Sequence, residues 1–133
     1  LKKASARLQT LHDLGLGYLT LGEPTPALSG GEAQRLKLAS EMGKAQDGSV
    51  FVFDEPSIGL HPLDVAVLLD VFDSLVESGA TVIVIEHDLD VIRNADYIVD
   101  MGPGGGEDGG EVVCMGAPAQ VAACEQSMTG RDL

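Results

Sequence analysis

In Leu28-Ser29-Gly30-Gly31-Glu32-Ala33-Gln34-Arg35, a capping residue and two glycines precede an apolar run with helical spacing. Ser29 and Glu32, three residues apart, form a capping box, and the pattern predicts a helix over residues 28–43. The glycines leave no side chain over the first amide groups, so phosphate oxygens can approach the positive end of the helix, each contact contributing about 0.3–1 kcal/mol. The same pattern also occurs in helices where the capping box only stabilises the helix end. The prediction of an anion site therefore needs support from the rest of the sequence.

Two short apolar runs further along the chain end in acidic residues or a histidine. Residues 50–53 lead into Asp54 and Glu55, and residues 81–85 lead through Glu86 into His87. Uninterrupted apolar runs of this length predict strands that are buried on both faces of a parallel sheet. Ligands bind where the carboxyl ends of such strands meet, so we expect Asp54, Glu55 and His87 at one edge of the sheet.

The remaining pattern places helices and a hairpin around these strands. Residues 64–78 carry one apolar stripe and predict a crossover helix, which completes a β-α-β unit. Residues 97–101 and 111–115 predict a terminal hairpin with a glycine-rich turn between them, and residues 125–133 predict a loose tail. Further helices are expected over residues 1–14, 88–95 and 118–124, with a loop over 18–26.

Size and composition limit the classes of protein. With 133 residues, 44% of them hydrophobic, the chain can bury one modest core and is one domain or part of one. No apolar run approaches the roughly 20 residues of a membrane helix and no secretory pattern is present, which predicts a cytoplasmic protein without a membrane partner. The net charge of −13 argues against a DNA-gripping surface. Cys114 and Cys124 lack the spacing of a zinc site, so no zinc is expected.

Four motifs in order make the chain resemble the nucleotide-binding domain of the ABC ATPase superfamily. Residues 28–32 (LSGGE) are similar to its signature motif, residues 50–55 to its Walker B strand, residues 57–61 to its D-loop, and His87 to its switch histidine. Over residues 8–122, the sequence around these motifs further resembles the UvrA family, the damage-sensing subunits of the bacterial excision-repair nuclease. The resemblance implies an α/β fold, a partial P-loop NTPase with a mostly parallel sheet flanked by helices, and specifically the carboxyl-terminal part of a second nucleotide-binding domain.

The resemblance implies a role for each motif residue. It implies that Asp54 holds Mg²⁺ through water, that Glu55 orients or deprotonates the attacking water, and that His87 contacts the γ-phosphate of ATP. The signature residues would complete the ATP site of a partner domain; they are Ser29, Gly30, Gly31 and Glu32. The D-loop residues would lie at the interface of two nucleotide-binding domains; they are Ser57, Gly59 and His61.

The phosphate loop of such ATPases, GxxxxGK followed by Ser or Thr, occurs nowhere in the sequence. We therefore expect two partners in the ATP sites, the missing amino-terminal half of this domain and a second nucleotide-binding domain, and we expect the isolated chain to be inactive. By resemblance, the parent is an ATP-hydrolysing protein of nucleotide excision repair that acts with damaged DNA and a UvrB-like subunit. Two alternatives stay open: the nucleotide-binding domain of an ABC transporter, and a truncated ABC fragment without catalytic activity.

Overall fold

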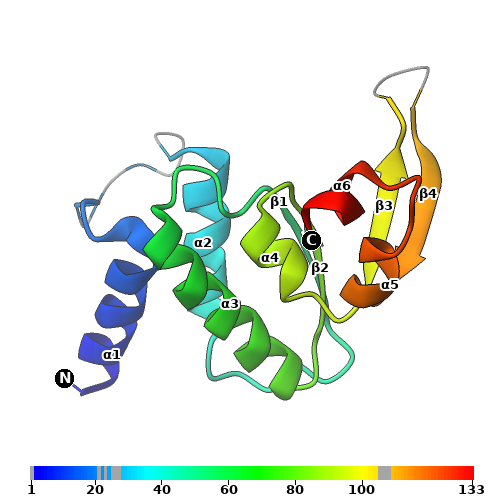
Figure 1. The fold of residues 1–133 in the computed structure, drawn as a ribbon. Helices are drawn as coiled ribbons and strands as arrows, with labels where there is room; N and C mark the ends of the chain where they lie inside the picture. Colours follow the sequence, from blue (N-terminus) through cyan, green and yellow to red (C-terminus); the bar gives the residue numbers. More distant parts are fainter. Residues whose placement is uncertain (1, 21, 23, 25–27, 105–108) are drawn as a thin grey trace. The chain divides into compact units, whose positions relative to one another are not determined.

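The chain divides into two compact units, Leu1–Glu86 and His87–Leu133. Figure 1 shows both in a computed structural model, which describes residues 2–20, 22, 24, 28–104 and 109–133. The predicted loop over 18–26 and the predicted glycine-rich turn lie partly outside the described residues. None of the helices in these ranges combines the length and apolarity that crossing a lipid bilayer requires.

The helices of the first unit follow the predicted order. Helix α1 covers Lys2–Leu11 and runs into a short π-helical turn, η1, at His12–Leu16. Regular α-helical geometry ends earlier than predicted because Gly15, inside η1, has φ +73°, a conformation that interrupts a helix. Helix α2 covers Gly30–Glu41 and helix α3 covers Pro62–Glu77, close to the predicted ranges.

Two parallel strands form the sheet of the first unit. Strand β1 (Val50–Asp54) pairs with strand β2 (Thr81–Ile85) in a register that runs from Val50 opposite Thr81 to Asp54 opposite Ile85. Helix α3 connects the two strands, which confirms the predicted β-α-β unit. Because the strands are parallel, their carboxyl ends lie together, and Asp54 reaches the same edge as the end of β2.

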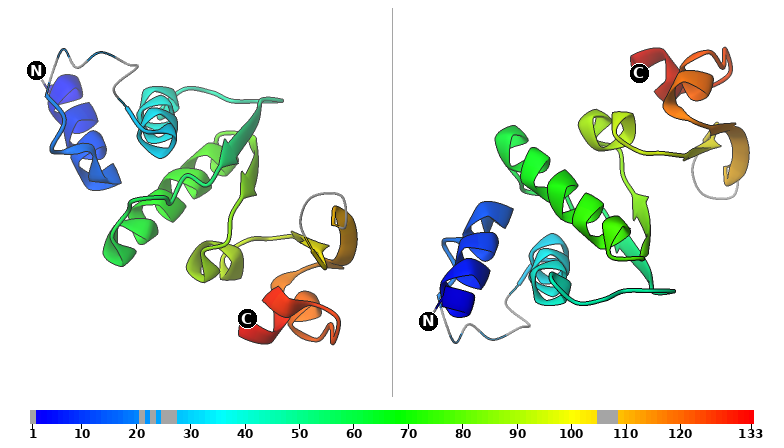
Figure 2. Two further views of the ribbon diagram at one scale, coloured as in Figure 1. Left: turned by 90° about the horizontal axis from the view of Figure 1, so that it is seen from above. Right: turned by 90° about the horizontal axis from the view of Figure 1, so that it is seen from below.

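The core of the first unit lies between α3, α2 and one face of the sheet. Figure 2 shows α3 running alongside the two strands. The Phe53 ring on β1 packs against the Phe72 ring on α3, with 5.4 Å between the ring centroids. The buried side chains of this cluster are Leu14, Leu38, Ala39, Phe53, Leu68, Val71, Phe72, Leu75 and Ala80.

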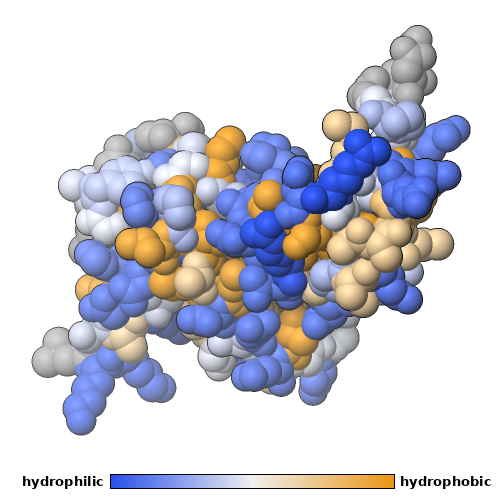
Figure 3. Space-filling model, viewed as in Figure 1, coloured by the Kyte–Doolittle hydropathy of each residue, from blue (hydrophilic) through white to orange (hydrophobic). Residues whose placement is uncertain are grey.

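The prediction that both strands are buried on both faces is wrong for this chain. Side chains alternate across a strand, and the outward set on β1 leaves Val50 62% and Val52 61% exposed, while Ile83 and Ile85 on β2 are also exposed. The inward set packs on the core, and no element of the described unit covers the other face. Figure 3 shows one side of the molecule, on which orange, hydrophobic residues reach the surface between hydrophilic ones.

The second unit is built on the predicted hairpin. Strand β3 (Ile98–Gly102) pairs with strand β4 (Glu111–Gly116) in antiparallel fashion, with a register shift between Asp100 and Met101. The other elements of this unit are the short helices α4 (Leu89–Arg93), α5 (Pro118–Ala122) and α6 (Met128–Asp132).

The tail over residues 125–133 is not loose, because α6 forms there and is attached to the hairpin. Ser127 is fully buried and caps α6, accepting a hydrogen bond from the Gly130 N–H at 2.7 Å. Its hydroxyl donates to Asp100 Oδ2 at 2.5 Å, and the Thr129 hydroxyl donates to Asp100 Oδ1 at 3.1 Å. A carboxylate on β3 thus holds the segment in place. This partner lies 27 residues earlier in the sequence, where a local pattern does not reveal it.

Candidate functional site

The amino end of α2 has the predicted capping box. The Ser29 hydroxyl accepts from the Glu32 N–H at 3.3 Å, and the Glu32 carboxylate accepts from the Ser29 N–H at 2.7 Å. Ser29 and Gly30 are exposed, and a Cβ at Gly30 would meet nothing within 4 Å. The first turn of a helix cannot pair its own N–H groups, so this end is open to an anion. The Glu32 side chain serves the cap, and its predicted contact with ATP stays a prediction.

Gly31 serves the packing of α2, in contrast to Gly30. It is buried, and a Cβ there would lie 2.7 Å from Ile58 Cγ2 and 2.9 Å from Arg35 Nη1. Helix α2 therefore needs glycine at this position to approach the turn that follows β1. The sequence pattern predicts the same role for both glycines, an uncovered helix end, whereas in the structure Gly30 is open and Gly31 is packed.

Replacing each of these two glycines with alanine should show which of them is required for packing. We expect Gly31→Ala to destabilise the chain by about 1–3 kcal/mol, since an added methyl group must displace Ile58 or Arg35. Gly30→Ala should leave stability unchanged or raise it slightly, because alanine favours a helix by up to about 1 kcal/mol over glycine. Urea unfolding followed by circular dichroism measures both. Equal unfolding midpoints for the two variants would contradict this assignment of Gly31.

The end of β1 carries the two predicted acidic residues in an unusual turn. Asp54 is the last residue of the strand, and Glu55 follows with φ +47°, in the left-handed region that few residues other than glycine adopt. The Glu55 N–H donates to the Ile85 carbonyl on β2 at 2.9 Å. Both side chains are exposed, so their carboxylates are accessible at the sheet edge where the prediction places them.

Two residues of α2 that sequence analysis did not single out contact this turn. The Gln34 amide makes two hydrogen bonds to the backbone of Asp54, at 2.6 and 2.8 Å. Arg35 is 2% exposed, and its Nη1 donates to the carbonyls of Pro56 at 2.8 Å and Ile58 at 3.0 Å. Burial lowers the pKa of Arg35, and the Glu32 charge acts in the opposite direction. The four-residue spacing from the buried Gly31 is the signal that places Arg35 on the same helix face.

The D-loop residues lie in the connection from β1 to α3. The Ser57 N–H donates to Glu86 Oε1 at 2.8 Å, which ties the connection to the end of β2. Gly59 has φ +75° and makes the predicted tight turn. His61 is the exposed amino-terminal cap of α3, where its Nδ1 accepts from the Leu63 N–H at 3.2 Å. The contribution of this loop to a domain interface stays a prediction.

Most of the predicted site residues belong to the first unit, and one belongs to the second. The signature helix end and the Asp54–Glu55 pair belong to the first unit, joined through α2. His87 is exposed and begins the second unit, one residue after Glu86 in the chain. Its predicted place beside Asp54 and Glu55 stays a prediction.

The described residues contain no group of three or more His, Cys, Asp or Glu side chains that could enclose a metal ion. Mg²⁺ does not require such a group, because it keeps several waters and binds through one or two carboxylates together with substrate phosphates. The exposed carboxylates of Asp54 and Glu55 fit that mode of binding.

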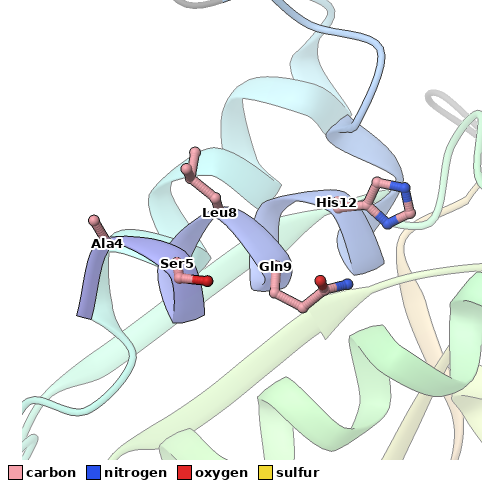
Figure 4. A pocket seen from close by; sticks show the side chains of 5 residues that line it. All are labelled: Ala4, Ser5, Leu8, Gln9 and His12. Atoms are coloured by element: carbon pink, nitrogen blue, oxygen red, sulfur yellow. The ribbon is translucent and has the colours of Figure 1, made fainter. Parts of the chain in front are cut away.

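A shallow pocket lies along α1 and the start of η1 (Figure 4). Its lining residues come from this helical segment alone and include no acidic or basic side chain other than a histidine. They are Ala4, Ser5, Leu8, Gln9 and His12. The pocket shares no residue with the motifs described above, and we assign no site to it.

The chain is highly similar in sequence to part of several known proteins. No protein-family model matches the chain. UvrABC system protein A from Bacillus subtilis is 55% identical over 132 residues, which is 98% of this chain and 14% of the relative, and the one from Mycoplasmopsis pulmonis is 56% identical over 128 residues, or 96% and 14%. Over almost its whole length, the chain is therefore similar to one segment of UvrA proteins. It spans 14% of the length of these UvrA relatives.

Solved structures agree with the UvrA assignment. UvrA2 from Deinococcus radiodurans matches 96% of this chain, and 16% of its own, with a TM-score of 0.88 and 49% identity. CbiO1 from Clostridium perfringens, part of an ABC transporter complex, matches 94% of this chain and 47% of its own with a TM-score of 0.54 and 26% identity. The predicted ABC ATPase-like α/β fold is thereby confirmed, and the UvrA match exceeds the transporter match on both measures.

Proposed function

We propose that this chain is the part of a UvrA-type ATPase of nucleotide excision repair that carries the signature helix and the Walker B strand of the second nucleotide-binding domain. The main support for the proposal is the direct connection between helix α2 and the Asp54–Glu55 turn. The helix whose amino end is open, α2, is joined to the backbone of Asp54 by two hydrogen bonds of Gln34, within a chain that is 55% identical to UvrABC system protein A from Bacillus subtilis. The open end of α2 and the Asp54–Glu55 pair are the two surfaces that an ATP site shared between two domains needs.

The two surfaces would serve two different nucleotides. Ser29, Gly30 and Gly31 would face ATP held by a partner domain, where the helix dipole and free amides favour phosphate. Asp54 would hold Mg²⁺ through water and Glu55 would orient or deprotonate the attacking water at this domain's own ATP. His87 would contact the γ-phosphate. Mg²⁺, when bound, would neutralise charge on the phosphates.

We propose that other parts of the whole UvrA-type protein contact DNA. Duplex binding depends on neutralising several phosphates with lysine and arginine, whereas this chain has 8 basic and 21 acidic residues. We propose that damaged DNA and a UvrB-like subunit are partners of the whole protein, and that the phosphate loop, absent from these 133 residues, comes from the rest of the same domain. The chain alone would then bind ATP weakly and hydrolyse none.

Comparison of the full-length gene product with the 133-residue chain tests this proposal. We expect the full-length protein to hydrolyse ATP and its steady-state rate to change when a duplex with a bulky lesion replaces an undamaged duplex. The 133-residue chain should show no turnover above buffer. The proposal fails if the full-length protein does not hydrolyse ATP, or if its rate is the same with both duplexes.

A further inference from the structure

We propose that Gln34 is a positioning residue for ATP hydrolysis, whose side-chain amide fixes the backbone of Asp54 and thereby the direction of the Glu55 carboxylate. This inference rests on the proposed ATPase function and adds a residue to its machinery. Gln34 lies on α2, outside the four motifs, and does not itself need to touch nucleotide.

The Gln34 amide pairs with both backbone groups of Asp54. Gln34 Nε2 donates to the Asp54 carbonyl at 2.6 Å, and the Asp54 N–H donates to Gln34 Oε1 at 2.8 Å. The two backbone groups of one strand residue point to the same side, away from those of the next residue. At Glu55 the N–H points to β2, where it donates to the Ile85 carbonyl. Gln34 therefore pairs the opposite edge of β1, as a neighbouring strand would.

The backbone conformation of Glu55 depends on its neighbours. With φ +47°, Glu55 holds a left-handed conformation that persists only where its surroundings enforce it. The contacts that enforce it lie on both sides. Gln34 fixes the preceding residue, and the Glu55 carbonyl accepts from the Ile58 N–H at 3.1 Å. Without the amide, the Asp54–Glu55 peptide can rotate toward an unstrained conformation, and the carboxylate leaves its position.

Gln34 belongs to the same helix as the signature residues. It lies five residues after Ser29, on the helix whose first turn is open to an anion, so one helix joins that turn to Asp54. Arg35 and Glu86 hold the following residues of the connection, through Pro56, Ile58 and Ser57. Among the described contacts, Gln34 is the side chain that holds Asp54 itself, so its loss can displace Glu55 while the rest of the turn stays anchored.

The test uses the full-length gene product with Gln34→Met, which keeps the length of the side chain and removes both hydrogen bonds. We expect kcat for ATP hydrolysis to fall roughly tenfold to a hundredfold, the scale of a displaced catalytic group. The KM for ATP should change by less than about threefold, since binding contacts remain. Gln9→Met is the matched control. Gln9 donates to the Asp13 side chain at 2.7 Å on exposed α1, and its replacement should leave kcat unchanged.

A double-mutant cycle separates a positioning role from a structural one. If Gln34 acts through Glu55, then Gln34→Met combined with Glu55→Gln should have the same kcat as Glu55→Gln alone. Two results overturn the inference: a kcat for Gln34→Met within about twofold of the unmodified protein, or multiplicative losses in the double variant. If Gln34→Met unfolds, Gln34→Glu, which keeps an acceptor for the Asp54 N–H, replaces it under the same criteria. Unchanged turnover in Glu55→Gln would instead overturn the proposed function.

Discussion

Glu55→Gln is expected to lower kcat for ATP hydrolysis by the full-length protein about 10²–10⁴-fold, the usual contribution of a positioned general base. Glutamine has the size of glutamate and preserves the turn, but its amide cannot accept the proton of the attacking water. Glu55 is exposed at the edge where β1 and β2 end, and its backbone is fixed on both sides. The loss should therefore come from chemistry and leave the fold intact.

Single-turnover hydrolysis of ATP, measured beside equilibrium binding of ATP, distinguishes chemistry from affinity. We expect the Kd for ATP to stay within about threefold, because Glu55 contributes to the transition state more than to the bound substrate. Glu77→Gln, the same substitution at the exposed end of α3, is the control and should leave the hydrolysis rate unchanged. A rate for Glu55→Gln close to that of the control would remove Glu55 from the catalytic role.

The features that could be predicted from the sequence are those with local causes. The capping box needs Ser29 and Glu32 only three residues apart, and the structure confirms both of its hydrogen bonds. The crossover helix α3 follows from an apolar stripe with a proline in its first turn. The order of strand, helix and strand then leaves a parallel pair as the simplest arrangement, which places Asp54 at the shared edge.

The features that could not be predicted depend on partners distant in sequence. The burial of Arg35 is one such feature, because an arginine is almost never fully buried unless its donors are paired. Its partners, the carbonyls of Pro56 and Ile58, lie 21 and 23 residues away, and only the folded chain brings them to it. The prediction that β1 and β2 are buried on both faces is wrong for a related reason. An apolar run shows that a strand can be covered on both faces, whereas burial requires an element to cover each face.

Arg35→Met is expected to destabilise the 133-residue chain by about 2–4 kcal/mol. Methionine fills a similar volume but leaves the buried Pro56 carbonyl and the partly buried Ile58 carbonyl without their donor. A buried polar group left unpaired costs about 1–3 kcal/mol, and a partly buried one costs less. Relief from burying a charge reduces the loss, since the same burial that lowers the pKa of Arg35 also opposes its folding into the interior. The hydrogen bonds should outweigh this relief because both are charge-assisted.

Urea unfolding of Arg35→Met, Arg35→Lys and Lys37→Met isolates the cause. Lysine keeps the charge but lacks the planar guanidinium that reaches two carbonyls from one nitrogen, so Arg35→Lys should also destabilise the chain. Lys37 is exposed on the same helix, and Lys37→Met should change stability by less than about 0.5 kcal/mol. If Arg35→Met were as stable as Lys37→Met, the contact between α2 and the 55–61 connection would not depend on the guanidinium. The packing of Gly31 against Ile58 would then be what holds the signature helix to the end of β1.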